Sequence, residues 1–170
     1  VLAKPLHFVY EALGPHLRPP GVAVDLGCGV GTATLFLLEK GFEVYSVDRS
    51  EEAISILQSR LPDGARAHPV VADMMAFPIP ECDVITAGFS LFFLNQDQLA
   101  EFWPRLVAAL RPGGLFAGQF LGPNDEWADK GHALVDEGML REMFAAFEFI
   151  HFEEVDREGE TSVGNPKHWH

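Results

Sequence analysis

The stretch that decides the fold runs Val22-Ala23-Val24-Asp25-Leu26-Gly27-Cys28-Gly29-Val30-Gly31-Thr32. Its first five residues have the apolar, β-branched character of a buried strand, and residues 32–39 have the pattern of a helix that ends before Gly41. Glycines between a strand and a helix allow a tight turn and let a ligand approach the main chain. The stretch therefore predicts a strand, a ligand-facing turn and a helix in direct succession. A plain tight turn without a ligand is the alternative interpretation.

The rest of the chain continues this alternation of strands and helices. Further helices are predicted over Leu6–Leu17, from the cap Ser50 to the turn at Pro62, over Leu99–Leu110, and from Asp136 to about Phe147. Further strands are predicted over Phe42–Val47, Ala67–Ala72, Asp83–Gly88, Leu115–Phe120 and Phe149–Val155. Such alternation indicates an α/β sandwich of three layers, with a mostly parallel sheet between helices. The 170 residues are enough for one domain, predicted to span residues 1–170.

The charge of the chain restricts its partners. Asp and Glu number 25 against 12 Lys and Arg, which gives a formal net charge of −13 at pH 7. Such a surface repels a phosphate backbone and an anionic membrane. We therefore expect no nucleic-acid partner, and the sequence carries no signal for the oligomeric state.

Several features favour a cytoplasmic protein. No run of about 18 apolar residues is present, so no membrane-spanning helix is predicted, and no secretory signal is recognisable at the start. Two cysteines, Cys28 and Cys82, are too few for a disulfide framework. At the other end, residues 168–170 have the pattern of the opening of a strand. Because strands usually run about five or six residues, we expect this last strand to be incomplete.

Asp25 narrows the class of ligand. A dinucleotide fingerprint has a glycine or alanine at the position that Thr32 occupies here, and it presents a pyrophosphate to the start of the helix. A carboxylate two residues before Gly27 repels a pyrophosphate but attracts an ammonium group. The turn therefore favours S-adenosylmethionine, which has an ammonium group, a sulfonium and no phosphate.

Acidic residues also follow the next two predicted strands. Asp48 ends the second strand, where a carboxylate can accept both hydroxyls of a ribose; an ordinary cap or turn residue is the alternative. After the third strand, Asp73 can accept from an adenine amine and Met74 can lay its thioether on the ring, or the pair is a solvated aspartate beside a core methionine. Because the carboxyl ends of parallel strands share one sheet edge, these residues are predicted to form a single cradle.

Together these motifs resemble the class I S-adenosylmethionine-dependent methyltransferase family. The likeness rests on residues 24–32, Asp48, Asp73 and the turn over residues 110–114, and it extends over nearly the whole chain. It implies a Rossmann-like, mostly parallel seven-stranded sheet that ends in an antiparallel hairpin. It also implies S-adenosylmethionine as cofactor, S-adenosylhomocysteine as product, and methyl transfer to an acceptor that we expect to be a small molecule.

The resemblance assigns the cofactor contacts residue by residue. It places the turn against the methionine portion, Asp48 on the ribose, and Asp73 with Met74 on the adenine. The segment over residues 88–93 takes the place where such enzymes line the transfer site, and it departs from the Asn-Pro-Pro-Tyr type of motif used on nucleobase or amide nitrogens. The predicted cofactor residues are Asp25, Gly27, Cys28, Gly29, Gly31, Asp48, Arg49, Asp73, Met74, Gly88 and Phe89.

For the chemical step, the sequence offers candidates without choosing among them. Methyl transfer depends mainly on holding donor and acceptor in line, and a general base helps where the acceptor carries a proton. His132 and Asp125 follow the fifth strand on the ligand-facing edge and are the candidate bases, although an isolated histidine is more often a surface or core residue. Residues 122–127 are predicted to form a lid or substrate loop. No metal site is predicted, since His168 and His170 have no third ligand.

Two other functions fit the same fold. A nicotinamide-dependent oxidoreductase is one, because fold alone does not decide function, but Asp25 and Thr32 argue against it. A sensor or scaffold that binds S-adenosylmethionine without catalysis is the other, and it would use the same cofactor residues.

Overall fold

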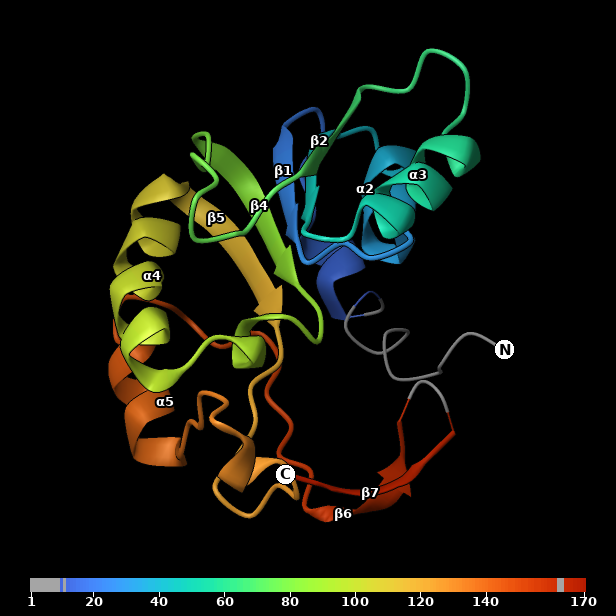
Figure 1. Ribbon diagram of the computed structural model, residues 1–170. Coiled ribbons are helices and arrows are strands. Elements are labelled where there is room, and N and C mark those ends of the chain that lie inside the picture. Colours follow the sequence, from blue (N-terminus) through green and yellow to red (C-terminus); the bar gives the residue numbers. More distant parts are fainter. Residues whose placement is uncertain (1–9, 11, 162–163) are drawn as a thin grey trace.

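The computed structural model describes residues 10, 12–161 and 164–170, and its centre is a sheet of five parallel strands (Figure 1). The strand order is β3-β2-β1-β4-β5. The strands are β1 (Val22–Leu26), β2 (Glu43–Asp48), β3 (Ala67–Val71), β4 (Cys82–Ala87) and β5 (Leu110–Gly118). The order reverses between β1 and β4, so the turns after these two strands diverge and open a crevice at the carboxyl edge. The predicted Rossmann-like α/β class is confirmed.

Helices cover both faces of this sheet. In Figure 1, α2 and α3 lie on one side of the sheet, and α4 and α5 lie on the other. Their bounds are α2 (Thr32–Glu39), α3 (Glu51–Arg60), α4 (Gln96–Ala109) and α5 (Glu137–Met143), with short 3-10 turns at η1 (Gly14–His16), η2 (Leu91–Phe93) and η3 (Ala128–Lys130). Of the helix predicted over Leu6–Leu17, residues 6–9 and 11 lie outside the described residues; residues 10, 12 and 13 are helical, and the 3-10 turn η1 follows them. No helix in the described part of the chain is long and apolar enough to cross a membrane.

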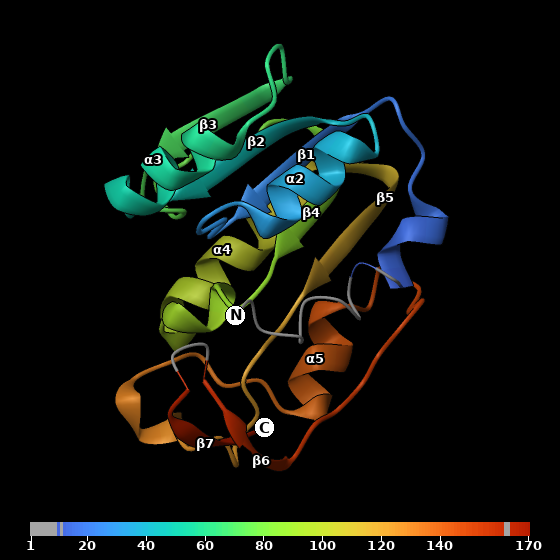
Figure 2. The same ribbon diagram turned by 90° about the vertical axis from the view of Figure 1, so that its right-hand side faces the viewer.

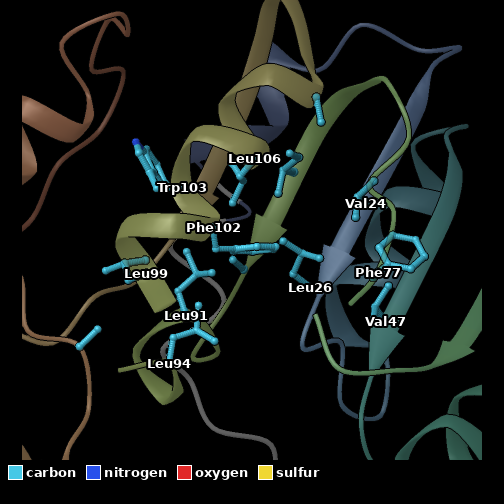
Figure 3. Close-up of a cluster of buried hydrophobic side chains, with 14 of the residues drawn as sticks. Val24, Leu26, Val47, Phe77, Leu91, Leu94, Leu99, Phe102, Trp103 and Leu106 are labelled. Carbon is cyan, nitrogen blue, oxygen red and sulfur yellow. The ribbon is translucent and has the colours of Figure 1, made fainter. Parts of the chain in front are cut away.

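Two apolar clusters pack on opposite faces of the sheet. Val24 and Leu26 of β1 pack with Phe102 of α4 on one face (Figure 3), and Ala23 packs with Leu37 of α2 on the other. Successive strand residues point to opposite faces, so β1 is buried on both sides, and this explains its unbroken apolar run. Full burial of a side chain as large as Phe102 contributes roughly 1.5–3 kcal/mol.

Helix caps explain where several elements begin. The Ser50 hydroxyl accepts from the Ala53 N–H at 3.2 Å, which starts α3 where the sequence predicted it. α4 begins three residues before its predicted start at Leu99, because Asn95 and Gln98 form a reciprocal capping box. Conversely, α5 ends at Met143 rather than near Phe147, and single turns follow it.

The C-terminal strands differ from the prediction. The predicted strand over residues 149–155 is wrong: these residues form no strand, and Phe149, Ile150 and Phe152 are 44–51% exposed. Their apolar residues favour a strand, but a strand also requires a hydrogen-bonded neighbour. Instead, β6 (Arg157–Glu160) and β7 (Pro166–Trp169) form an antiparallel hairpin that stands apart from the five-stranded sheet (Figures 1 and 2). The seven strands of the described residues therefore form two sheets, not the single one expected.

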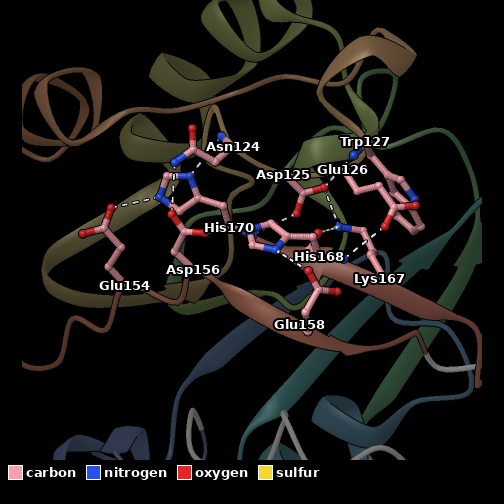
Figure 4. A network of polar contacts seen from close by, with 10 residues as sticks. All are labelled: Asn124, Asp125, Glu126, Trp127, Glu154, Asp156, Glu158, Lys167, His168 and His170. Atoms are coloured by element: carbon pink, nitrogen blue, oxygen red, sulfur yellow. Dashed lines mark hydrogen bonds and ion pairs between the residues drawn. The ribbon is translucent and has the colours of Figure 1, made fainter.

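A buried ion pair attaches this hairpin to the segment after β5 (Figure 4). The Lys167 ammonium donates to the Asp125 carboxylate, and both side chains are at most 1% exposed. The ammonium also lies 3.9 Å from the ring centre of Trp169 and 4.7 Å from that of Trp127. The second Asp125 oxygen accepts from the His170 N–H at 3.0 Å. Residues 122–127, predicted as a lid or substrate loop, thus hold the hairpin.

Histidine–carboxylate contacts also join the end of the chain to β6 and to the residues just before it, on the exposed side. The His168 imidazole bonds Glu158 at 2.9 Å and Asp156 at 2.6 Å, and these bonds raise the pKa of His168. His170 bonds Glu154 at 3.0 Å. Because the folded-state pKa of His168 is raised, its stabilising contribution is complete below the unfolded-state pKa and is lost as the pH rises through the folded-state value.

We predict that the Lys167–Asp125 pair is strongly coupled. Lys167→Met leaves the buried carboxylate without a cation and should lower the free energy of unfolding by about 3–5 kcal/mol. The double variant Asp125→Asn/Lys167→Met should lose clearly less than the sum of the two single variants. Urea unfolding followed by tryptophan fluorescence measures each value.

The exposed pair Glu137–Arg141 is the control for this cycle. Its nitrogen and oxygen lie 2.6 Å apart across one turn of α5, and both side chains are more than half exposed. Its coupling should be about 0.3–0.5 kcal/mol. A coupling of similar size for the buried pair would contradict the structural role given to Lys167.

Candidate functional site

The glycine-rich turn after β1 is held by the end of β2. The N–H groups of Gly27 and Cys28 donate to the Val47 carbonyl at 2.8 and 3.0 Å. The Gly29 N–H donates to the Asp48 carboxylate at 2.9 Å. The Gly31 N–H donates to the Cys28 carbonyl, also at 2.9 Å. Four of the five N–H groups of the turn thus have acceptors within the chain.

The three glycines of the turn have different surroundings. A Cβ added at Gly27 would meet Ser90 at 2.3 Å, and one added at Gly31 would meet Leu57 at 2.2 Å, so these two positions allow close packing. A Cβ added at Gly29 would meet nothing within 4 Å, although its φ of +51° also favours glycine. The turn is therefore open at Gly29, where a ligand can approach the main chain.

Asp25 is buried within the sheet rather than facing the crevice. It is 2% exposed, and its two oxygens accept from the hydroxyls of Thr34 at 2.7 Å and Thr86 at 2.9 Å. Burial raises the pKa of Asp25 to about 6, although the two hydroxyls lower it, and the charge of Asp48 adds a smaller rise. The prediction that Asp25 forms part of an open cradle is therefore corrected. Its side chain does not line the crevice, and its charge lies beneath the glycine-rich turn.

The hydroxyl of Tyr10 lies close to this buried charge. The oxygen is buried and has no hydrogen-bond partner among the described residues. Burial, and secondarily the charge of Asp25, raise the pKa of Tyr10. Its ring stacks on Phe36 with the centroids 4.8 Å apart. A buried hydroxyl without a partner is costly, so Tyr10 is a further candidate for contact with a ligand.

The residues after β2 and β3 meet at the same sheet edge. The Ala72 N–H donates to the Asp48 carbonyl at 3.0 Å, which places Asp73 and Met74 beside the end of β2. Asp73 is exposed, and one of its oxygens accepts from the Met75 N–H at 2.8 Å. Met74 is partly buried against the core, and Arg49 is exposed. The structure thus brings Asp48 and Asp73 together at one edge, whereas Asp25 is buried within the sheet.

The segment after β4 packs against the turn. The Ser90 hydroxyl donates to the Leu26 carbonyl at 2.7 Å. Between Gly88 and Ser90, Phe89 has a φ of +53°, a strained value for a residue with a side chain. Its N–H donates to the Gln119 side chain at 2.9 Å, and its ring contacts Trp169 edge-on, 5.8 Å between centroids. Strain of this kind is common at functional sites and is maintained by the surrounding contacts.

The two candidate bases have different environments. Asp125 is corrected to a structural residue, because it is 3% exposed and both of its oxygens accept hydrogen bonds within the hairpin attachment. His132 lies among the rings of Phe92, Phe93 and Trp127, with centroids 5.5–6.3 Å from its own. Burial, followed by the charges of Asp25 and Asp48, raises the pKa of the Cys28 thiol, which disfavours the thiolate form that a nucleophile needs.

Sequence reasoning missed the partners of Asp25. The hydroxyls of Thr34 and Ser46 share a hydrogen bond of 2.8 Å, so Asp25 belongs to a buried polar network that joins β1, α2 and β2. The available signal was a polar residue inside an apolar strand, at Ser46 and at Thr86. Lys167 was also missed, because nothing local predicts the burial of a lysine.

A family of methyltransferase domains matches residues 23–114. Trans-aconitate 2-methyltransferase of Escherichia coli is 34% identical over 116 residues, which are 66% of this chain and 43% of that protein. Carboxy-S-adenosyl-L-methionine synthase of Vibrio atlanticus is 28% identical over 106 residues, 58% of this chain and 44% of that protein. This chain therefore spans less than half the length of these curated relatives.

The fold is shared with a solved structure. TehB from Haemophilus influenzae superposes with a TM-score of 0.76 at 22% sequence identity, over 96% of this chain and 59% of that one. The family match covers the turn, the ends of β2, β3 and β4, and the start of β5, which are the elements that form the site. The chain belongs to the methyltransferase domain family.

Proposed function

We propose that this chain binds S-adenosylmethionine at the carboxyl edge of its sheet and transfers the methyl group to a small-molecule acceptor. One observation carries the proposal. Four of the five N–H groups of the turn donate to acceptors within the chain, the turn is open at Gly29, and the carboxylates of Asp48 and Asp25 lie beside and behind it. A phosphate needs free N–H donors at such a turn. A cationic amino-acid nucleoside needs negative charge instead.

The residues of the crevice match the parts of this cofactor. The open main chain at Gly29 suits the polar methionine end, as does the Tyr10 hydroxyl, which has no partner among the described residues. The buried charge of Asp25 suits the ammonium group. Each Asp48 oxygen already accepts one backbone N–H, from Gly29 or from Ser50 at 2.9 Å, and keeps a free lone pair for a ribose hydroxyl. Asp73 and Met74 remain the proposed adenine contacts, with Arg49 beside them.

When bound, S-adenosylmethionine supplies a methyl group on a positively charged sulfur, which leaves as the neutral thioether. The chain's own contribution is to hold the reacting groups in line, which is worth up to about 7–11 kcal/mol in favourable cases. Phe89 and Phe92 are placed to exclude water next to the turn, and His132 is the remaining candidate base if the acceptor carries a proton.

The proposal of a small-molecule acceptor rests on the net charge of the chain and on its relatives. The net charge of −13 counts against a nucleic acid. The relatives include a methyltransferase of the small molecule trans-aconitate, which supports a small acceptor here. We also propose a cytoplasmic location, supported by two buried cysteines that are both free thiols.

Binding and transfer can be tested separately. Isothermal calorimetry should detect binding of S-adenosylmethionine and S-adenosylhomocysteine but not of NADH. Incubation with methyl-labelled S-adenosylmethionine and a small-molecule extract should then yield a labelled product. Tight NADH binding without binding of the adenosyl compounds would refute the proposal. Cofactor binding that never yields labelled product would instead make the chain a sensor or scaffold.

Asp48→Ala should weaken binding of S-adenosylhomocysteine by about 10- to 100-fold, the typical loss of a hydrogen bond to a charged group. Asp63→Ala, in the exposed loop after α3, is the matched control and should leave the affinity unchanged. Calorimetry gives both constants, and thermal unfolding checks that each variant is folded. Equal effects of the two substitutions would contradict the ribose contact.

The pKa of Asp25 predicts how binding depends on pH. Because burial raises this pKa to about 6, the carboxyl gains a proton as the pH falls below that value and loses its attraction for an ammonium group. The affinity for S-adenosylmethionine should therefore fall by up to about tenfold for each pH unit below ~6. Asp25→Asn has no such titration and should give a flat profile. The same slope in both proteins would rule out Asp25 as the origin.

Without a ligand, the titration of Asp25 should change the free energy of unfolding in the opposite direction, so that stability falls as the pH rises. Between the unfolded-state pKa and about 6, the native chain holds a proton that the unfolded chain has released. The contribution of Asp25 to the free energy of unfolding therefore decreases as the pH rises through this window.

A further inference from the structure

The loop after β3, residues 73–77, folds around Asp73. The Asp73 carbonyl accepts the N–H groups of Ala76 and Phe77 at 3.0 and 3.1 Å. One oxygen of the Asp73 side chain accepts the Met75 N–H at 2.8 Å, and the other accepts no hydrogen bond from the described residues. The loop is therefore a compact turn that leaves one carboxylate oxygen available to a ligand.

The residues that follow this loop offer few backbone donors. They are Pro78-Ile79-Pro80, and a proline has no N–H group. Carbonyl groups beside such a stretch need donors from elsewhere in the chain. A guanidinium suits this task, because it carries a permanent charge and five N–H donors in a planar arrangement.

Arg105 of α4 supplies these donors. Its guanidinium donates to the Met75 carbonyl at 2.8 Å and to the Phe77 carbonyl at 3.3 Å. The same group lies over the ring of Phe102, with its Cζ atom 5.3 Å from the ring centre. Phe102 and Phe77 both belong to the apolar cluster of Figure 3. A buried ring and two carbonyls thus fix the guanidinium, which joins α4 to the loop.

The loop is held at both ends. At its start, the Ala72 N–H donates to the Asp48 carbonyl at 3.0 Å, and at its end Arg105 binds the two carbonyls. These carbonyls lie 30 and 28 residues before Arg105 in the sequence, so the contact fixes one element relative to another rather than capping a helix. Asp73 lies between the two points of attachment.

We propose that Arg105 is a positioning residue for adenine recognition, which holds the loop so that the available Asp73 oxygen can accept the exocyclic amine of the base. This inference rests on the proposed binding of S-adenosylmethionine, and it gives a role to a residue outside the proposed cofactor contacts. Hydrogen bonds weaken steeply when their geometry departs from the preferred one. A carboxylate on a loop that is free to move therefore recognises the amine poorly.

Three ligands that share the ribose and homocysteine portions separate recognition of the base from the rest of binding. S-adenosylhomocysteine carries adenine, S-inosylhomocysteine carries an oxygen in place of the amine, and S-ribosylhomocysteine carries no base. Calorimetry gives their dissociation constants. The unsubstituted chain should prefer adenine over hypoxanthine by about 10- to 100-fold, because an oxygen cannot donate a hydrogen bond to Asp73.

Arg105→Met should lower the affinity for S-adenosylhomocysteine by about tenfold, since a loosened loop loses much of one hydrogen bond to a charged group. The affinity for S-ribosylhomocysteine should stay the same, because this ligand has no base to contact the loop. Asp73→Asn keeps an acceptor for the Met75 N–H but removes the charged acceptor of the amine. Arg105→Met added to Asp73→Asn should therefore cause no further loss of the preference for adenine.

Two further variants make the comparison specific. Arg141→Met removes the same charge from an exposed arginine of α5, and it should leave all three affinities unchanged. Arg105→Lys keeps the charge but lacks the planar fork that holds both carbonyls, so its preference for adenine should be intermediate. Thermal unfolding checks each variant, and Arg105→Lys carries the comparison if Arg105→Met does not fold. An equal loss of affinity for all three ligands, or an unchanged preference for adenine, would overturn the proposal.

The two proposals fail in different ways. If S-adenosylhomocysteine does not bind the unsubstituted chain, the cofactor proposal fails and the adenine role fails with it. Amide hydrogen exchange of residues 75–77, faster in Arg105→Met than in Arg141→Met, would then still show that Arg105 holds the loop. If S-adenosylhomocysteine binds and Arg105→Met keeps the full preference for adenine, the positioning role fails and the cofactor site stands.

Discussion

Hydrogen bonds from the glycine-rich turn to the end of β2 fix the shape of the turn, and the site depends on this constraint. The Val47 carbonyl accepts two N–H groups of the turn, and the Asp48 carboxylate accepts a third. In sites for phosphate, the N–H groups of such a turn point toward the ligand. Here four of the five N–H groups of the turn donate to acceptors within the protein, which counts against an anion bound at the turn. The fold is shared with dinucleotide-binding proteins, but the direction of these few hydrogen bonds decides the class of ligand.

Elements whose structure depends mainly on neighbouring residues could be predicted from the sequence. β1 and α2 have the predicted bounds, and Ser50 starts α3 as expected, because a strand, a glycine turn and a helix cap each depend on neighbouring residues. Residues 149–155 could not be predicted in this way. Their composition favours a strand, but whether a strand forms depends on a partner elsewhere in the chain. The same holds for Lys167, whose burial depends on Asp125, 42 residues away.

The two buried carboxylates show how far sequence reasoning reaches at the site. Both aspartates were identified as candidates from their place after or within a strand. Burial raises the pKa of Asp25, which has hydroxyl partners but no cation among the described residues, and a positively charged ligand would relieve the cost of its charge. Asp125 already has a cation in Lys167. A buried charge that lacks its counterion is a functional candidate, whereas one that has it serves the structure, and only the fold tells them apart.

The family match ends at residue 114, so it bears on the cofactor site more than on the residues that follow. The turn and the ends of β2 and β3 lie within the matched residues 23–114, and there hydrogen bonds of the backbone fix the shape of the turn. Most of β5, α5 and the hairpin lie beyond the match, and there side chains such as Lys167 and Asp125 hold the elements together. Substitutions in this second part can change these contacts without disturbing the turn. Relatives that share the first part can therefore share the cofactor turn and still differ in the elements that follow it.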